Sequence, residues 1–293
     1  MARLRLAFPR QADAARELVR CHLLRHASNQ AGGLEPGGGL HHGIERIHGR
    51  DHEQFHGLSF FLGHLDHVAE QLLFVVGEER DSLGAQTANE YAARADGFSC
   101  RFLVNGEPTE NRIALASKGT LRVEVTAKGR MAHSAYPELG DSAIDKLIPA
   151  LTRLRAMPLP ADREVGACTL NIGLIEGGRA PNVIPDYAHA DLLYRLVGPS
   201  EELRRHIVAA AGDHVEVTFP LELPFLRLRT VDGLPTMIAA FTTDIPKLTN
   251  WGEPLLIGPG SIHVAHTDGE YIEKKQLADA IDLYCRIAKE LLG

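Results

Sequence analysis

Short apolar runs occur between residues 58 and 104 and again near the C-terminus. Each run is followed within about ten residues by His, Asp or Glu. These runs are residues 58–63, 72–76, 101–104 and 254–257. Runs of this length predict buried strands, and a helical stretch at residues 82–94 between two of them favours an α/β sheet. Because ligands bind at the carboxyl ends of strands in such sheets, the polar residues after the runs predict a site there.

Between residues 112 and 219 the pattern changes to longer, alternating segments. The predicted order is strand 120–129, helix 141–156, strand 168–177, strand 187–197, helix 200–212 and strand 214–219. This β-α-β-β-α-β order is that of a ferredoxin-like module. Leu121, Val123 and Val125 alternate with charged residues, as expected of a sheet with one buried face. We therefore predict one domain from residues 1–111 and 220–293, into which a second domain, residues 112–219, is inserted.

The sequence also predicts the start of one helix and the buried face of another. Ser200 precedes Glu201 and Glu202, which predicts a helix start with Ser200 as its cap. Residues 271–292 form an amphipathic helix that we expect to pack on the sheet. Its apolar positions are Leu277, Ile281, Tyr284, Ile287, Ala288 and Leu291.

Composition narrows the class of protein. Hydrophobic residues make up 44% of the 293 residues and charged residues 24%, as in a globular protein with a sizeable core. The net charge of -7 argues against binding to nucleic acid or an anionic membrane, and favours small-molecule chemistry. No apolar run has the length of a membrane span and no secretory leader is recognisable, so we expect a cytoplasmic protein. The four cysteines are far apart, which predicts neither disulfides nor a thiolate zinc site.

Residues 1–57 read differently from the rest of the chain. Gly, His and Arg crowd this region, and only residues 11–25 show a helical pattern, so it predicts little core. A deletion or a frame-shifted reading of the gene would fit this composition, a hypothesis that resequencing the locus would test.

The residues after the apolar runs form a set of metal-binding types without cysteine. His64 and Asp66 lie in an H-x-D pattern, Glu78 and Glu79 are adjacent, and two further candidates are Glu107 and His266. Imidazoles with carboxylates suit Zn²⁺, Co²⁺ or Mn²⁺, and one of two adjacent glutamates can bind metal while the other acts on water as a general base. A single His in a chain with 15 of them is more often structural. The joint placement after strands is what favours the functional interpretation.

Six segments resemble, in order, motifs of the M20 family of metal-dependent peptidases and deacylases. They are GHLDHV, LLFVVGEERDSLGA, VNGEPTEN, GRMAHSAYPELGDSAIDKL, GGRAPNVIPD and GPGSIHVAHTDGEYI, and the resemblance extends over residues 60–293. The resemblance implies a zinc-exopeptidase-like α/β/α catalytic domain with an inserted ferredoxin-like dimerisation domain. The most similar group removes acetyl or succinyl groups from amino acids of arginine, lysine and diaminopimelate biosynthesis, which implies an N-acyl amino acid or short peptide as substrate and a homodimer as the assembly.

The resemblance also implies a role for each residue of the site. Two metal ions, Zn²⁺ or Co²⁺, would be held in each subunit. The implied metal ligands are His64 with Glu107 for one ion and Glu79 with His266 for the other. The implied catalytic residues are Glu78 as general base, Asp66 orienting His64, and His133 stabilising the oxyanion in the partner subunit. The implied substrate-binding residues are Asn182, Arg195 and Gly260. The alternative for Arg195 is an exposed cation at a strand end.

The chain departs from this family between its first two motifs. Asp66 and Glu78 are twelve positions apart, whereas the family has a longer segment after the position of Val68 that includes an Asp bridging both metals. A parallel crossover needs a dozen or more residues, so the usual strand order cannot form there. Two cations roughly 3.5–4 Å apart also need a bridging anion. We therefore predict weakened metal binding and low or no activity.

Three functions remain open at this stage. The first is a metal-dependent hydrolase of N-acyl amino acids. The second is a dipeptidase or carboxypeptidase of the same family, which would differ on the acyl side of the pocket. The third is a non-catalytic dimeric remnant of the family.

Overall fold

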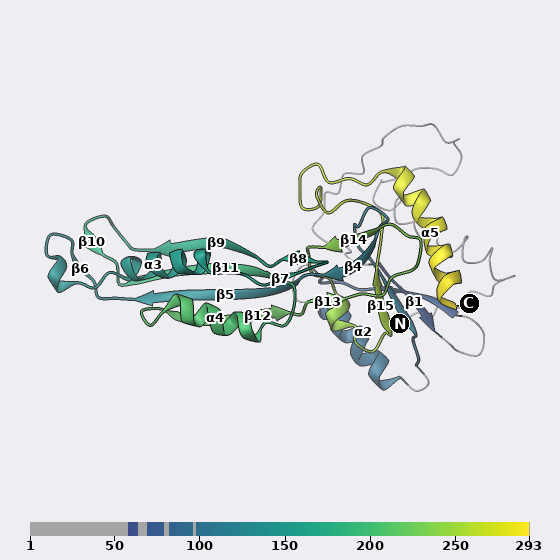
Figure 1. The fold of residues 1–293 in the computed structure, drawn as a ribbon, viewed down its shortest axis with the longest axis horizontal. Helices are drawn as coiled ribbons and strands as arrows, with labels where there is room; N and C mark the ends of the chain where they lie inside the picture. The colour runs from purple at the N-terminus through teal and green to yellow at the C-terminus, as the bar shows by residue number, and fades with distance from the viewer. Residues whose placement is uncertain (1–57, 64–68, 79–81, 96–97, 293) are drawn as a thin grey trace. The chain divides into compact units, whose positions relative to one another are not determined.

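A computed structural model describes residues 58–63, 69–78, 82–95 and 98–292. The predictions made for residues 1–57 lie outside the described residues. The chain divides into two compact units (Figure 1). The first comprises the described parts of Met1–Leu115, Leu228–Met237 and Thr243–Gly293, and the second comprises Ala116–Arg227 and Ile238–Thr242. The second unit thus extends beyond the predicted end at residue 219 and includes residues 238–242, which were predicted for the first domain. The roles assigned to the two domains stay predictions.

The first unit is built on a four-stranded sheet of order β15-β3-β1-β2. Its elements are β1 (Leu58–Gly63), β2 (Ala69–Phe74), α2 (Leu83–Arg94), β3 (Phe102–Gly106), η2 (Ile245–Lys247), β15 (Glu253–Leu256) and α5 (Lys274–Leu292). Strands β3 and β15 are parallel, while β1 pairs antiparallel with both β2 and β3. The predicted helix at residues 82–94 and the four predicted strands all form, although β2 ends at Phe74, before the two valines that the apolar run includes.

Strands β1 and β2, consecutive along the chain, pair antiparallel, with Leu58 opposite Phe74 and Gly63 opposite Ala69. Antiparallel neighbours can be joined by a short connection, whereas a parallel crossover cannot. The short spacing that ruled out a parallel arrangement from the sequence is thus accommodated by pairing the two strands in opposite directions.

Helices cover both faces of this sheet. Successive side chains of β3 point to opposite faces, so neighbouring residues of the strand pack against different helices. Phe102 and Val104 pack with Tyr284 of the C-terminal helix, as predicted for that helix. Leu103 packs instead with Ala85 of α2. The result is an α/β/α arrangement, with the carboxyl ends of β3 and β15 at one edge of the sheet.

The second unit contains the predicted β-α-β-β-α-β module. Its main elements are β5 (Gly119–Lys128), α3 (Ala143–Ala156), β9 (Thr169–Gly177), β11 (Tyr187–Leu196), α4 (Glu201–Ala211) and β12 (Glu216–Leu223). The sheet order is β12-β5-β11-β9 and every neighbouring pair is antiparallel. Leu121, Val123 and Val125 of β5 share one buried cluster with residues of both helices. The alternation read from the sequence therefore marks the face that the helices cover.

Short elements complete the second unit and the connection to the first. They are β4 (Ile113–Ser117), β6 (Ala132–His133), η1 (Pro137–Leu139), β7 (Ala161–Asp162), β8 (Gly166–Ala167), β10 (Val183–Ile184), β13 (Leu226–Arg227) and β14 (Thr236–Ala239). Strand β6 pairs with β10, β7 pairs with β8, and β13, β4 and β14 form a three-stranded sheet. The β6–β10 pair stands at the end of the module away from β7 and β8 (Figure 1).

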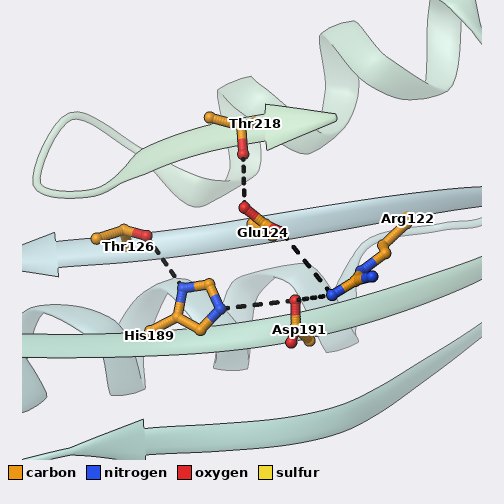
Figure 2. A network of polar contacts seen from close by, with 6 residues as sticks. All are labelled: Arg122, Glu124, Thr126, His189, Asp191 and Thr218. Atoms are coloured by element: carbon orange, nitrogen blue, oxygen red, sulfur yellow. Dashed lines mark hydrogen bonds and ion pairs between the residues drawn. The ribbon is translucent and has the colours of Figure 1, made fainter. Parts of the chain in front are cut away.

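A network of polar side chains lies on the other face of the module's sheet (Figure 2). Asp191 of β11 accepts a hydrogen bond from Arg122 at 3.3 Å and lies 3.5 Å from His189. The other ring nitrogen of His189 is 3.1 Å from the Thr126 hydroxyl, and Thr218 bonds to Glu124 at 3.3 Å. These contacts join three strands across an open face, which explains why β5 alternates apolar and polar residues.

The prediction that the Ser200 side chain caps α4 is wrong. Ser200 does occupy the position before the helix, but its side chain makes no capping bond. Its hydroxyl instead donates to Glu222 Oε1 of β12 at 2.7 Å. In contrast, the hydroxyl of Ser142 caps α3 by accepting the Asp145 N–H at 3.2 Å. In the described part of the chain, no helix combines the length and the apolar character that crossing a membrane requires.

Candidate active site

The structure describes seven of the ten predicted site residues. They are Glu78, Glu107, His133, Asn182, Arg195, Gly260 and His266. His64, Asp66 and Glu79 lie outside the described residues. The first unit contains Glu78, Glu107, Gly260 and His266, and the second contains the other three.

Glu107 directly follows β3, at the carboxyl end of the strand that runs parallel to β15. Gly258 lies beside it, and a Cβ atom there would come within 2.5 Å of the Glu107 carbonyl oxygen. The Thr109 hydroxyl accepts the Gly258 N–H at 2.9 Å, and the Thr109 N–H donates to the Glu107 carbonyl at 2.8 Å. Glycine is therefore required at position 258 for the two loops to meet at this edge.

The loop after β3 contains two non-glycine residues with left-handed backbone, Glu110 and Asn111, each with φ of 58°. Their N–H groups donate to the carbonyls of Gly260 and Gly258, both at 2.8 Å. The Ser261 hydroxyl adds a bond to Glu110 Oε1 at 2.7 Å. Unfavourable backbone persists only where its surroundings impose it, and it is common at functional sites. This loop and the turn at residues 258–261 form one hydrogen-bonded unit.

Gly260 also has a backbone that favours glycine, with φ of 91°. Its carbonyl accepts from Glu110 and its N–H donates to Gln276 Oε1 at 2.7 Å. Because the N–H is already engaged, a role of Gly260 in substrate binding would rest on the close approach that a missing side chain allows.

Tyr284 of α5 lies beneath the Glu107 loop. Its hydroxyl donates to the Ile257 carbonyl at 3.0 Å. Burial raises the pKa of Tyr284, and the negative charge of Glu107 raises it further. The Ile257 N–H in turn donates to the Asn105 carbonyl of β3 at 3.0 Å, so α5 supports the end of β15 beside the strand that leads to the predicted ligand.

Glu78 lies between β2 and α2, half-buried, in a connection that folds back on the helix start. The Ser82 N–H donates to the Gly77 carbonyl at 2.8 Å, and the Gly84 N–H donates to the Val76 carbonyl at 3.0 Å. The carboxyl of Asp244 is fully buried beside Ser82, and burial raises its pKa. These contacts fix both ends of the segment that holds the predicted general base.

His266 is exposed and has left-handed backbone with φ of 62°. Its N–H donates to Glu270 Oε2 at 3.1 Å. A β-carbon-bearing residue with this φ is uncommon, although His tolerates it better than most. The Glu270 contact holds the loop after β15 in the conformation that this backbone requires.

Two of the four predicted metal ligands, Glu107 and His266, lie among the residues that the structure describes. Glu107 and His266 offer a carboxylate and an imidazole, which are donors that Zn²⁺ and Co²⁺ accept. No group of three or more His, Cys, Asp or Glu suited to a metal occurs among the residues that the structure describes. The donor types fit such an ion, but a complete catalytic site needs ligands from beyond the described part, where His64 and Glu79 lie.

The structure brings His133 and Asn182 together at the end of the inserted module. His133 of β6 pairs with Val183 of β10, and the Ser134 N–H donates to the Asn182 carbonyl at 3.0 Å. The Ala135 N–H donates to His133 Nδ1 at 3.1 Å. This bond assigns the neutral ring proton to Nε2, which leaves an exposed N–H able to stabilise negative charge.

Arg195 lies near the other end of β11, where it pairs with Thr120 of β5. Its Nη1 donates to the Thr120 hydroxyl at 2.8 Å, and burial lowers its pKa. No carboxylate among the described residues contacts it. Eight residues along the strand separate it from Tyr187 near the β6–β10 pair, a distance of about 26 Å. Arg195 and His133 of one chain therefore cannot bind the same small substrate.

Sequence reasoning did not identify Asn111, Gln276 or Asp244 as residues of this region. A left-handed Asn and a Gln at a helix start leave no distinctive local pattern. Asp244 lies in TTDIP, where an Asp before a Pro-containing turn is ordinary. Only the tertiary contacts show that these side chains adjoin the site.

Comparison with known proteins bears on the family and the fold of the chain. Residues 115–218 match the family model described as the peptidase dimerisation domain of M20 peptidases. The chain is 37% identical over 221 residues to a peptidase M20 domain-containing protein of Schizosaccharomyces pombe, and the match covers 74% of this chain and 54% of the relative. It is 35% identical over 260 residues to a probable carboxypeptidase of Ajellomyces dermatitidis, with 78% and 60% covered. The chain thus spans little more than half the length of these relatives.

Solved structures show the same fold at lower identity. The aminopeptidase PepT from Bacillus cereus is 19% identical and superposes with a TM-score of 0.61, covering 96% of this chain and 71% of that one. A tripeptidase from Staphylococcus aureus is 18% identical with a TM-score of 0.57, covering 75% and 64%. Both comparisons support an α/β fold with an inserted dimerisation domain.

Proposed function

Because the chain belongs to the M20 family of peptidases, we propose that it is a metal-dependent hydrolase that cleaves the amide bond of N-acyl amino acids. The observation that carries the proposal is the edge of the sheet where Glu107, after β3, meets the turn at residues 258–261, after β15. Two loops from neighbouring parallel strands are locked together there, at the position where α/β sheets bind ligands.

The proposed ligands are His64 and Glu107 for one ion and Glu79 and His266 for the other. Zn²⁺ or Co²⁺ bound there would supply Lewis acidity and lower the pKa of water. Glu78 then takes the proton from the attacking water and returns it to the leaving amine.

His133 of the partner subunit donates its Nε2 proton to the tetrahedral oxyanion. Arg195 holds the α-carboxylate of the substrate, and Asn182 of the partner subunit binds it nearby. A half-buried guanidinium without a carboxylate partner among the described residues is suited to a substrate carboxylate.

The distance between His133 and Arg195 within one inserted module supports a site built from two chains. His133 and Arg195 of one chain are too far apart for one small substrate, so the site would combine Arg195 of one protomer with the partner's His133. Catalysis then depends on a homodimer. The activity per chain should fall when the protein concentration is lowered below the dissociation constant of the dimer.

Strand β9 is the edge that we propose for dimer formation. The other edge, β12, is interrupted by a register shift between Thr218 and Leu221 and by Pro220, features that block pairing with another strand. Strand β9 instead exposes Leu174 and Ile175, at 42% and 60%. The pairing of β9 with β11 also shifts, at Gly173, but β9 contains no proline, and its exposed apolar residues favour association with a second copy.

Substitution of the proposed base tests the enzyme hypothesis. We expect Glu78→Ala to abolish hydrolysis with little effect on the fold, since the residue lies in a connection and not in the core. An unchanged rate would show that the measured hydrolysis does not come from this site. The absence of any hydrolysis in the parent protein would favour the non-catalytic remnant instead.

A dipeptidase or carboxypeptidase is the second candidate function, favoured by the probable carboxypeptidase among the relatives. Rates measured on acetylornithine, acetyl-lysine, succinyl-diaminopimelate and dipeptides would separate the two. Higher kcat/KM on dipeptides than on all the acylated amino acids would reject the deacylase.

Metal analysis tests the consequence of the missing bridging Asp. We expect protein purified with added Zn²⁺ or Co²⁺ to hold its metal weakly and to lose activity on brief exposure to a chelator. Recovery of two tightly held ions per chain would contradict this expectation.

A further inference from the structure

Gln276, in the first turn of α5, contacts both loops at the carboxyl edge of the sheet. Its side-chain Oε1 accepts the Gly260 N–H at 2.7 Å. Its backbone carbonyl accepts from Asn111 Nδ2 at 2.9 Å. One residue thus joins the loop that follows β3 to the turn that follows β15.

The helix gives Gln276 a fixed position. Tyr284, Ile287 and Leu291 of α5 are buried in the cluster that includes Phe102 of β3 and Leu255 of β15. A helix held by a buried face moves little relative to its sheet, so its first turn can act as a fixed point for the less regular loops.

The two loops need such a fixed point because their backbones are unfavourable. Glu110 and Asn111 are left-handed and not glycine, and Gly260 has φ of 91°. Each loop donates to or accepts from the other, as in the bond from the Glu110 N–H to the Gly260 carbonyl at 2.8 Å. Loosening one loop should therefore loosen the other.

We propose that Gln276 is a positioning residue that couples the turn at residues 258–261 to the loop carrying Glu107, so that both keep the geometry of the active site. The catalytic meaning of this role rests on the proposed function, but the coupling itself does not. Gln276 touches neither the proposed general base nor the reacting atoms, and acts through the loops that it holds.

Hydrogen–deuterium exchange of the full chain tests the coupling without reference to activity. In Gln276→Ala the Gly260 N–H loses its acceptor while the backbone bond to Asn111 can remain. The loss of one hydrogen bond corresponds to a roughly five- to tenfold increase in local opening. We expect this increase in peptides covering residues 257–262 and also in those covering residues 105–113, with no change in the strands of the inserted module.

Two matched variants control the experiment. Gln276→Glu keeps an oxygen at the same position and should restore slow exchange in both peptides. Lys275→Ala removes the neighbouring side chain, whose ion pair with Asp279 lies within the helix, and should change neither peptide. Faster exchange confined to residues 257–262, or equal exchange in Gln276→Ala and the parent protein, would overturn the proposed coupling.

Kinetics separate this inference from the proposed function. With an active parent protein, we expect Gln276→Ala to lower kcat/KM about tenfold, mainly through kcat, and Gln276→Glu to recover most of it. Faster exchange in both loops with unchanged kcat/KM would overturn the positioning role while leaving the hydrolase intact. If the parent protein cleaves none of the substrates, the proposed function fails, and the exchange data alone decide whether Gln276 couples the loops.

Discussion

Asn111 combines a left-handed backbone with a side-chain bond to the Gln276 carbonyl. Asn adopts this backbone at lower cost than most residues with a Cβ atom. We expect Asn111→Ala to lower the free energy of unfolding of its unit by about 2 kcal/mol, about half from the bond and half from the backbone.

Asn111→Gly separates these two contributions, because glycine keeps the backbone conformation and loses only the bond. Urea denaturation should therefore place it between the parent protein and Asn111→Ala. Equal loss in both variants would mean that the left-handed backbone has no measurable cost.

Asp162 links the β7–β8 hairpin to Arg227. Its Oδ1 accepts the N–H groups of Glu164 and Val165 at 2.8 and 2.9 Å, and these bonds together with Arg227 hold its pKa below the ordinary value of 3.8. A carboxyl with a depressed folded pKa stabilises the fold above the unfolded value. That stability is lost as the pH falls through the folded pKa.

We therefore expect the melting temperature to fall on acidification below pH 3.8, and to fall less steeply in Asp162→Asn, which cannot ionise. Thermal melts between pH 2 and pH 5 would measure the two slopes. Parallel slopes would show that Asp162 does not contribute to the acid sensitivity.

At the scale of elements, prediction from the sequence succeeded where the pattern is local. The alternation in β5 and the amphipathic stripe of α5 arise from burial of one face, which periodicity reports directly. The cap at Ser200 was mistaken because its hydroxyl bonds to Glu222, a partner on a strand 22 residues away. Gln276 escaped notice for the same reason, since its role exists only once two loops and a helix meet.

The connection before α2 offers an element-level prediction. A Cβ atom at Gly84 would lie 2.5 Å from both N and O of Val76, so Gly84→Ala must displace the helix start or the segment that carries Glu78. We expect a loss of about 1–3 kcal/mol in stability and a lower kcat. Gly198→Ala, with nothing within 4 Å of the added Cβ, is the matched control and should leave both unchanged.

For the whole molecule, the dimer proposal depends on the edge strand β9. We expect Ile175→Lys to shift the protein to monomers in sedimentation, because a charge on the edge strand opposes pairing with a second copy. Val208→Lys, at a comparably exposed position on α4, should not. If both variants sediment like the parent protein, another surface forms the assembly.

The inserted module begins and ends on adjacent strands, since Thr120 of β5 lies opposite Leu223 of β12. Its entry and exit points are therefore neighbours, as in domains that can be transplanted between hosts. A gene segment encoding residues 116–227 could be replaced by the equivalent piece of a relative, or closed by a short linker, without stretching the backbone. Recombination at these two points would exchange the module that carries His133 while leaving the four-stranded sheet of the first unit uninterrupted.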